Sequence, residues 1–203
     1  MEYEVTNLDD ICDAIGEKNL QELINGFECN RNLEVEKFLK EKAINLSKQG
    51  ISKTYIVTTY VDGENIIVGY FAIANKMTKV KKDFFGGKMK RRFEKFAETD
   101  ENANMYFASL PLIGQLGKNF QKNYNNYITG DILLNLACRQ VHEVQKMIGG
   151  RFVFLECEDI EKLKNFYEEN GFMCYNKRKL DKYESEDNVN YLLQMICDLS
   201  KFD

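Results

Sequence analysis

Thr129 and Gly130 stand at the start of a predicted helix, and their residue types suit the binding of an anion. Backbone N–H groups in the first turn of a helix have no intrahelical acceptor and carry a partial positive charge. A glycine there lets a phosphate group approach these N–H groups closely, and a threonine caps the helix through its hydroxyl oxygen. The pair therefore predicts a phosphate-binding helix start, with a simple capped helix as the alternative.

The elements around this pair, within residues 110–172, read in order as strand, loop, helix, strand and helix. The two strands are short apolar runs, which is typical of strands buried on both faces. Gly149 and Gly150 end the helix between them, because glycine adopts the left-handed conformation that a helix end requires. A crossover of this kind connects strands of a parallel sheet. The apolar stripe of the helix consists of Leu133, Ala137, Val141, Val144 and Ile148.

The segments before this stretch predict further helices and strands. Residues 1–26 read as two short helices, and a longer helix follows from about Leu33 to Lys48. Strands at Tyr55–Val61 and Ile66–Ala74 flank Asp62-Gly63, a dipeptide typical of a tight hairpin turn. We therefore expect an antiparallel hairpin in the first half of the chain.

Pro111 is the only proline, and it cannot donate a hydrogen bond to a central strand ladder. We expect the strand around it to begin there or to contain a bulge. Toward the C-terminus, the pattern predicts a strand to about Tyr175, a polar loop over residues 176–188 and a last strand at Val189–Asp198.

Three groups of residues resemble the GNAT superfamily of acetyl-coenzyme A-dependent N-acetyltransferases. Ile113-Gly114-Gln115-Leu116-Gly117-Lys118 is similar to the family's fourth strand, and Thr129-Gly130-Asp131-Ile132-Leu133-Leu134 to the start of its phosphate-binding helix. The most specific match is Asn165-Phe166-Tyr167-Glu168-Glu169-Asn170-Gly171-Phe172, which resembles the family's helix-to-strand signature. The resemblance implies a single GNAT-like α/β domain with a mixed, twisted sheet of about six to seven strands flanked by helices. Residues 27–203 would form the acetyltransferase domain, and residues 1–26 a helical segment of the same domain.

The resemblance also implies a site for acetyl-coenzyme A as cosubstrate, with no metal. Tyr167 matches the tyrosine that usually assists the leaving thiolate and is the catalytic candidate. The backbone N–H groups of residues 116–118 would stabilise the oxyanion. The cofactor-binding residues that the match implies are Leu116, Gly117, Lys118, Tyr127, Ile128, Thr129, Gly130 and Asp131.

Parts of the family pattern are missing from this sequence. The family's pyrophosphate loop runs Arg or Gln, two residues, Gly, one residue, and Gly or Ala, whereas residues 125–130 keep only the final glycine. Ile160 replaces an asparagine that stands seven residues before the signature tyrosine. Asp131 places a negative charge beside the predicted phosphate site, although acidic residues also stabilise helix starts by roughly 0.3–1 kcal/mol. We therefore expect acetyl-coenzyme A binding through contacts that differ from the family's.

The hydroxyl of Tyr167 could act on the leaving thiolate in two ways. Complete proton transfer from a tyrosine of pKa about 10 to a thiolate of pKa about 8.5 is uphill by roughly 2 kcal/mol. A hydrogen bond that stabilises the thiolate therefore explains the tyrosine as well as acid catalysis does. Packing of Tyr167 against Ile160 and Leu163, which share its helix face, is the structural alternative.

The sequence offers no evident general base. His142, the only histidine, lies off the apolar stripe of its helix, and we interpret it as a surface residue. Glu156 and Glu158 share one face of a strand and are the carboxylate candidates. Deprotonation at pH 7 costs a lysine amine roughly 4.6 kcal/mol but an α-amine only about 1.4 kcal/mol. The lack of a base therefore favours a weakly basic amine as acceptor.

Residues 76–95, called the basic segment below, contain nine basic and two acidic residues within a chain of net charge −4. Met89, Phe93 and Phe96 would lie on one side of a short helix, with the cations outward. A solvated helix face is one interpretation, and a docking surface for a polyanion such as RNA is the other. The cations that would face RNA are Lys88, Lys90, Arg91, Arg92 and Lys95.

Composition excludes a disordered chain, because 44% of the residues are hydrophobic. The N-terminal residues lack an apolar signal region, and no apolar run is long enough to cross a membrane. The six cysteines are scattered without metal-ligand spacing. These features predict a cytoplasmic protein that does not bind membranes, as a monomer or a homodimer.

Two classes of function therefore remain. One is an N-acetyltransferase that acts on an unidentified amine, and the other is a non-catalytic acyl-coenzyme A or RNA-binding protein of the same fold. The toxin branch of the superfamily acetylates the α-amine of aminoacyl-tRNA. A toxin-like enzyme of that kind would use both the basic segment and a weakly basic amine, although the acidity of the whole chain opposes broad affinity for nucleic acids.

Overall fold

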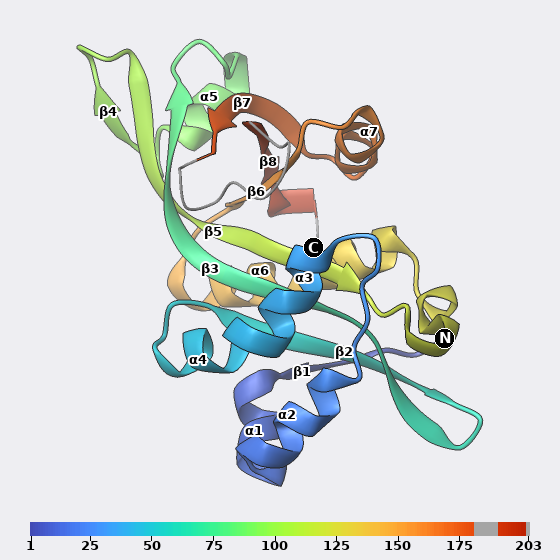
Figure 1. The fold of residues 1–203 in the computed structure, drawn as a ribbon. Coiled ribbons are helices and arrows are strands. Elements are labelled where there is room, and N and C mark those ends of the chain that lie inside the picture. The colour runs from blue at the N-terminus through green and yellow to red at the C-terminus, as the bar shows by residue number, and fades with distance from the viewer. Residues whose placement is uncertain (181–190, 202–203) are drawn as a thin grey trace. The chain divides into compact units, whose positions relative to one another are not determined.

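The computed structural model of the 203-residue chain describes residues 1–180 and 191–201. In these residues it has a mixed sheet of eight strands, with the order β1-β2-β3-β5-β6-β8-β7 and with β4 paired to β5 (Figure 1). The strands are β1 (Glu4–Asn7), β2 (Lys53–Val61), β3 (Glu64–Lys81), β4 (Glu98–Asp100), β5 (Met105–Lys118), β6 (Phe152–Glu158), β7 (Met173–Lys179) and β8 (Tyr191–Asp198).

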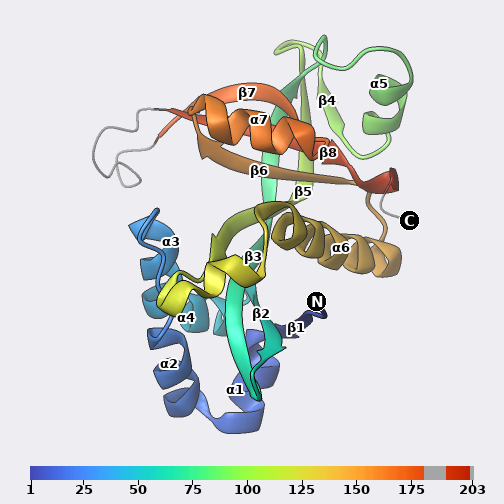
Figure 2. The same cartoon turned by 90° about the vertical axis from the view of Figure 1, so that its right-hand side faces the viewer.

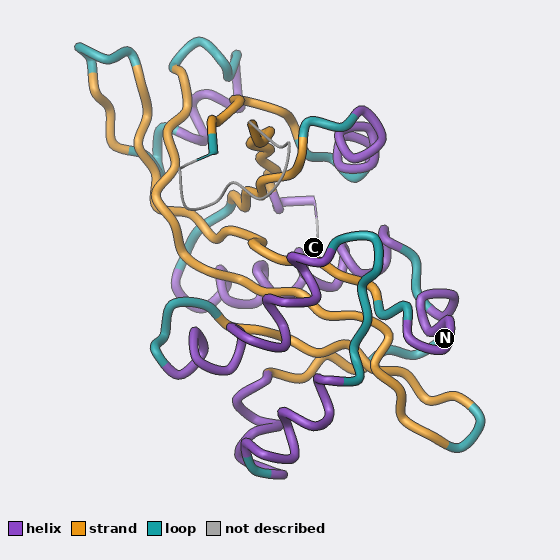
Figure 3. The backbone as a smooth tube through the Cα atoms, in the orientation of Figure 1, coloured by secondary structure: helices purple, strands orange, loops and turns teal. Residues whose placement is uncertain are grey.

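Helices connect these strands, and they show as purple segments in Figure 3. The α-helices are α1 (Leu8–Ile15), α2 (Glu17–Asn25), α3 (Leu33–Lys37), α4 (Ala43–Lys48), α5 (Gly87–Phe93), α6 (Gly130–Ile148) and α7 (Glu161–Glu169). A π-helical turn, Phe38–Lys42, joins α3 to α4, so that the predicted helix from Leu33 to Lys48 is continuous. Within the described ranges, no helix is long and apolar enough to span a membrane.

The chain divides into two compact units. The first unit consists of Met1–Ala74 and Ile113–Gln140, and the second of Asn75–Leu112 and Val141–Asp203. Both β5 and α6 contribute residues to each unit.

In the first unit, β1, β2 and the first part of β3 form an antiparallel arrangement. The turn between β2 and β3 contains Asp62 and Gly63, both with positive φ, as the predicted tight hairpin requires. Helices α1 and α2 lie side by side (Figure 1), and apolar residues from α1, α2 and the helix from Leu33 to Lys48 pack on Ile56 and Tyr70 of the strands. This packing gives the unit its own hydrophobic core.

In the second unit, β8 lies between β6 and β7 and pairs antiparallel with both. Helix α7 runs along these strands (Figure 2). The core is rich in aromatic residues: the Phe93 ring centroid of α5 lies 4.7 Å from that of Phe85 and 5.1 Å from that of Phe152. The predicted apolar side of α5 is confirmed for Phe93, which is fully buried, and for Met89, which packs on the same core. Phe96 lies beyond the end of the helix and is partly exposed.

The structure corrects the predicted strands in five places. Strand β3 runs to Lys81, seven residues past the predicted end at Ala74 and into the basic segment. Two short strands, β1 and β4, were not predicted, because they are polar and are held by pairing with their neighbours. Strand β5 begins at Met105 and runs through Pro111. Strand β7 continues to Lys179, into the segment predicted as a loop. The rest of that loop, with the predicted start of the last strand at Val189, falls outside the described residues.

Candidate active site

The end of β5 in the first unit is packed so closely that only glycine fits at position 117. A Cβ atom added to Gly117 would lie 2.4 Å from Cγ1 of Val35 and 3.2 Å from the ring of Tyr70. Tyr70 is itself fixed, because it is fully buried and its hydroxyl donates a 2.5 Å hydrogen bond to the carbonyl of Val35. A Cβ added to Gly69 of β3 would lie 2.9 Å from the carbonyl oxygen of Gly117, so the two backbones also touch.

The direction of the backbone N–H groups follows from one hydrogen bond. The N–H of Asn119 donates to the carbonyl of Val68 in β3, over 2.9 Å. Successive N–H groups along a strand point to opposite sides. The N–H groups of Leu116 and Lys118 therefore point away from β3. These two are among the groups that the sequence predicted as donors to an oxyanion.

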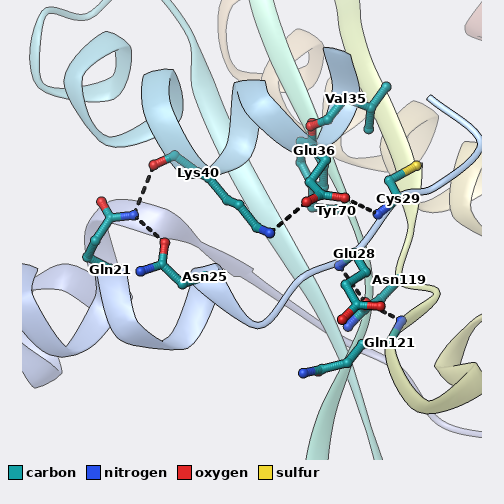
Figure 4. A network of polar contacts seen from close by, with 10 residues as sticks. All are labelled: Gln21, Asn25, Glu28, Cys29, Val35, Glu36, Lys40, Tyr70, Asn119 and Gln121. Atoms are coloured by element: carbon teal, nitrogen blue, oxygen red, sulfur yellow. Dashed lines mark hydrogen bonds and ion pairs between the residues drawn. The ribbon is translucent and has the colours of Figure 1, made fainter. Parts of the chain in front are cut away.

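Asn119 ties the segment between α2 and α3 to the end of β5 (Figure 4). Its side chain is 2% exposed, and its oxygen accepts hydrogen bonds of 3.1 Å from the N–H groups of Glu28 and Gln121. Its amide donates to the carbonyl of Ile67 over 2.8 Å. No local pattern predicts this role, because each partner except Gln121 is distant along the chain.

A second polar contact holds the same segment (Figure 4). The Glu36 carboxylate accepts hydrogen bonds of 2.7 Å from the Lys40 ammonium and from the N–H of Cys29. These two donors hold the pKa of Glu36 below its usual value. Segment 26–32 is thus fixed from both sides, by Asn119 and by Glu36.

Lys118 and Arg31 place positive charge beside the end of β5. Burial, and next the charge of Arg31, lower the pKa of Lys118. The Arg31 guanidinium lies 5.1 Å from the ring centroid of Phe120, a cation–π distance. Over the described part of the chain, neither cation forms an ion pair. Lys118 is therefore a half-buried lysine whose charge is not offset.

The start of α6, also in the first unit, has the predicted cap. The hydroxyl oxygen of Thr129 accepts a 3.2 Å hydrogen bond from the N–H of Ile132, and its carbonyl accepts one from Leu133. The N–H group of Gly130 belongs to the first turn, where a helix supplies no acceptor.

The residues before this cap are also held in place. The side chain of Ile128 is buried, and the carbonyl of Tyr127 accepts a 2.8 Å hydrogen bond from the hydroxyl of Tyr3. The preceding residues Gln121–Tyr127 form short 3₁₀ turns instead of an open loop. The entrance to α6 is therefore a defined structure.

Tyr167 lies on α7 in the second unit and is half-buried. Its ring contacts those of Phe166 and Phe172, at centroid distances of 5.0 and 6.0 Å. Burial, and to a lesser degree the nearby Cys157 thiol, raise the pKa of Tyr167. The hydroxyl therefore stays protonated at neutral pH and can serve as a hydrogen-bond donor. None of the described residues hydrogen-bonds to it.

The two carboxylate candidates for a base differ in their contacts. Arg178 donates hydrogen bonds of 3.0 and 2.7 Å to the Glu156 carboxylate, and Gln194 donates one of 2.6 Å. A carboxylate engaged in this way is poorly placed to accept a proton from a substrate. Glu158 is half-buried and forms no ion pair with any described residue. His142 is half-buried as well.

The basic segment contains cations of two kinds. Arg92 lies 3.4 Å from Asp198, a buried carboxylate that Arg151 also contacts at 2.7 Å. Arg92 is exposed, as predicted, but it is also part of an ion-pair cluster that offsets part of its charge. The other four form no ion pair within the described ranges: Lys88, Lys90, Arg91 and Lys95.

Within residues 1–180 and 191–201, no group of three or more His, Cys, Asp or Glu residues is arranged to hold a metal ion. All six cysteines are free.

No protein-family model matches the sequence, and no curated protein sequence matches it. Solved structures match nearly the whole chain. A point mutant of KacT superposes with a TM-score of 0.63 and 16% identity, over 100% of this chain and 98% of that chain. The chain has the GNAT fold.

Two further structures share this GNAT fold. AtaT complexed with acetyl-methionyl-tRNAfMet matches with a TM-score of 0.60 and 15% identity, over 95% of this chain and 94% of that one. AtaTR bound with AcCoA matches with a TM-score of 0.57 and 16% identity, over 99% and 96%. The fold that the sequence resemblance predicted is thereby confirmed.

Proposed function

We propose that the protein is an N-acetyltransferase that transfers an acetyl group from acetyl-coenzyme A to an amine. The observation that carries the proposal is that the first unit contains both a close-packed strand end, at Gly117, and a capped helix start, at Gly130. Gly117 and Gly130 stand at the two places where this GNAT fold would meet its cosubstrate. AtaTR, with the same fold, has been solved with AcCoA bound.

The residues present fit the phosphate groups of acetyl-coenzyme A. The first-turn N–H group of Gly130 offers a donor without an intrahelical acceptor, and Thr129 keeps the helix start in place. Ile128 stands where the family pattern has the first glycine of its pyrophosphate loop. Binding of the pyrophosphate therefore rests on the helix start more than on the loop before it.

When bound, acetyl-coenzyme A supplies a thioester whose acyl carbon is open to attack. The amine nitrogen forms a bond to that carbon, the carbon–sulfur bond breaks, and the amine loses a proton. The N–H groups of Leu116 and Lys118 would stabilise the charge that develops on the acyl oxygen. Tyr167, whose raised pKa keeps its proton in place, would donate a hydrogen bond to the leaving sulfur. Glu158 is the remaining carboxylate candidate for the base.

An α-amine carried by RNA is the acceptor that the surface favours. Four of the five cations predicted to face RNA lack ion pairs over the described ranges, and such cations bind phosphates. AtaT, of the same fold, has been solved with acetyl-methionyl-tRNAfMet. We place the reaction in the cytoplasm, because all six cysteines are free.

The test combines cofactor binding and turnover in two variants. At a hundredfold excess over Kd, acetyl-coenzyme A should stabilise the wild type by about 2.7 kcal/mol. This corresponds to a rise in Tm of roughly 5–10 °C for a chain of this length. Gly130→Glu should abolish the shift, because it places a carboxylate against the phosphates. Tyr167→Phe should keep the shift and lower kcat about 10²-fold, measured as coenzyme A release.

Gly86→Glu is the matched control, since Gly86 also precedes a helix and a Cβ there meets nothing within 4 Å. It should leave the acetyl-coenzyme A shift intact. The absence of any shift in the wild type at millimolar acetyl-coenzyme A would refute cofactor binding. A shift without coenzyme A release, for every amine and aminoacyl-RNA offered, would leave a non-catalytic acyl-coenzyme A-binding protein instead.

A further inference from the structure

The second unit has a surface groove that the proposed acetyl transfer does not use. Its volume is about 380 Å³, within the range of roughly 300–1,000 Å³ common for ligand clefts. The groove lies where β3, the segment after α5, and β5 come together. It is lined by Met77, Lys95, Phe96, Ala97, Glu98, Phe107 and Ser109.

Two phenylalanine rings give the groove an aromatic surface. Phe96 is 38% exposed, although its ring also packs edge-on against Phe152 at a centroid distance of 5.8 Å. Its position is fixed further by a 2.9 Å hydrogen bond from its N–H to the carbonyl of Phe93. Phe107 is half-buried on β5. Fixed, partly exposed rings can stack with planar groups at little cost in conformational entropy.

Cations from both ends of the basic segment surround these rings. The Lys79 ammonium lies 5.3 Å from the ring centroid of Phe107, and Lys95 belongs to the lining. Neither lysine forms an ion pair with a described residue, and Glu98 is the one acidic member of the lining.

We propose that this groove binds a short single-stranded stretch of nucleic acid. Bases would stack on Phe96 and Phe107, while Lys79 and Lys95 would contact the phosphates on either side. Aromatic rings alternating with cations are the combination that single-stranded nucleic acids require. A neutral peptide would gain little from the two lysines, which form no ion pair with a described residue. The inference deepens the RNA-acceptor form of the proposed function, but the binding needs no acetyl transfer.

The test is the binding of a labelled uridine decamer, followed by fluorescence anisotropy at 50 and 200 mM salt. The double variant Phe96→Leu and Phe107→Leu keeps apolar volume but removes both stacking faces, and it should weaken binding about tenfold with the salt slope unchanged. Lys79→Ser with Lys95→Ser should weaken binding and flatten the slope of log K against log salt by about 1.4, because two single-strand phosphate contacts are lost.

Matched controls lie in the first unit. Tyr60→Leu removes an aromatic ring that is 72% exposed, and Lys18→Ser removes an exposed cation. Neither should change decamer binding. Acetyl-coenzyme A should raise the Tm of every variant as it does that of the wild type.

Two outcomes would overturn the groove as a nucleic-acid site. One is no salt-sensitive decamer binding by the wild type at 50 mM salt. The other is a double leucine variant that binds the decamer with wild-type affinity. This holds even if the variant differs from the wild type in self-association, measured by sedimentation. Either outcome leaves acetyl-coenzyme A binding, and with it the proposed function, standing. Decamer binding without acetyl-coenzyme A binding would refute the proposed function and support the groove.

Discussion

The end of β5 in the first unit and the basic segment of the second unit are both candidate binding regions, but they are built in opposite ways. At the end of β5, Gly117 and Asn119 are buried, and each is in close contact with several neighbouring residues. In the basic segment, most cations are exposed and lack ion pairs to described residues. The first region presents backbone groups at fixed positions, whereas the second presents positively charged side chains that are exposed to solvent. Substitutions in the first should therefore cost stability, and those of the cations without ion pairs in the second should change affinity alone.

Gly117→Ala should give the largest effect on stability. The added Cβ would lie 2.4 Å from Cγ1 of Val35, and overpacking of this kind costs about 3 kcal/mol. Val35→Ala removes that carbon, so the double variant should lose less stability than the sum of the single variants. Urea unfolding of the four proteins measures the coupling. Strictly additive losses would show that the close packing at Gly117 is not what constrains the strand end.

Asp198→Asn should have the next largest effect. It tests Arg92, the cation of the basic segment that contacts a buried residue, as the groups of the first region do. It would leave Arg92 and Arg151 without their anion, at a cost of about 2 kcal/mol at pH 7, since both arginines are partly exposed and water screens them. Asp159→Asn is the control, because it breaks an exposed pair with Lys177 and should cost less than about 1 kcal/mol.

The same substitution should change the dependence of stability on pH. Burial alone would raise the pKa of Asp198, but hydrogen bonds from Ser200 and the Arg151 guanidinium hold it below its usual value. A carboxyl whose folded pKa is lowered contributes stability above its unfolded pKa, about 3.9, and loses it as pH falls through the folded pKa. The difference in unfolding free energy between wild type and Asp198→Asn should therefore shrink between pH 5 and pH 2. An equal difference at both pH values would mean that packing, and not charge, is lost.

Thr129→Ala should have the smallest effect, about 1 kcal/mol, because it removes only a helix cap. Thr129→Ser keeps the hydroxyl and should remain near wild type. Thermal unfolding with and without acetyl-coenzyme A separates the loss of the cap from the loss of the phosphate site. If alanine and serine behave alike, the cap contributes nothing to the helix start.

Local patterns explain what could be predicted from the sequence. The turn at Asp62-Gly63, the cap at Thr129 and the end of α6 at Gly149 depend on residues within a few positions, and the structure has all three. The Tyr-to-Gly-Phe signature predicted the fold, while the catalytic role of Tyr167 stays a prediction.

Long-range contacts explain what could not be predicted. The Asn119 contact with Glu28 spans 91 positions, and the Arg92 contact with Asp198 spans 106. No local pattern encodes such pairs. For the same reason, no local pattern showed that Arg92 pairs with Asp198 or that Asn119 organises the strand end.

The hydrogen bonds of Asn119 also bear on the order of folding. They join chain segments that are 52 and 91 positions away, so the loops between them must close before the bonds can form. We therefore expect Asn119 to be engaged late, after the transition state for folding of its unit. Loss of its side chain would then speed unfolding and leave the folding rate nearly unchanged. The segment beside the candidate active site would be the last part of the first unit to become ordered and the first to open.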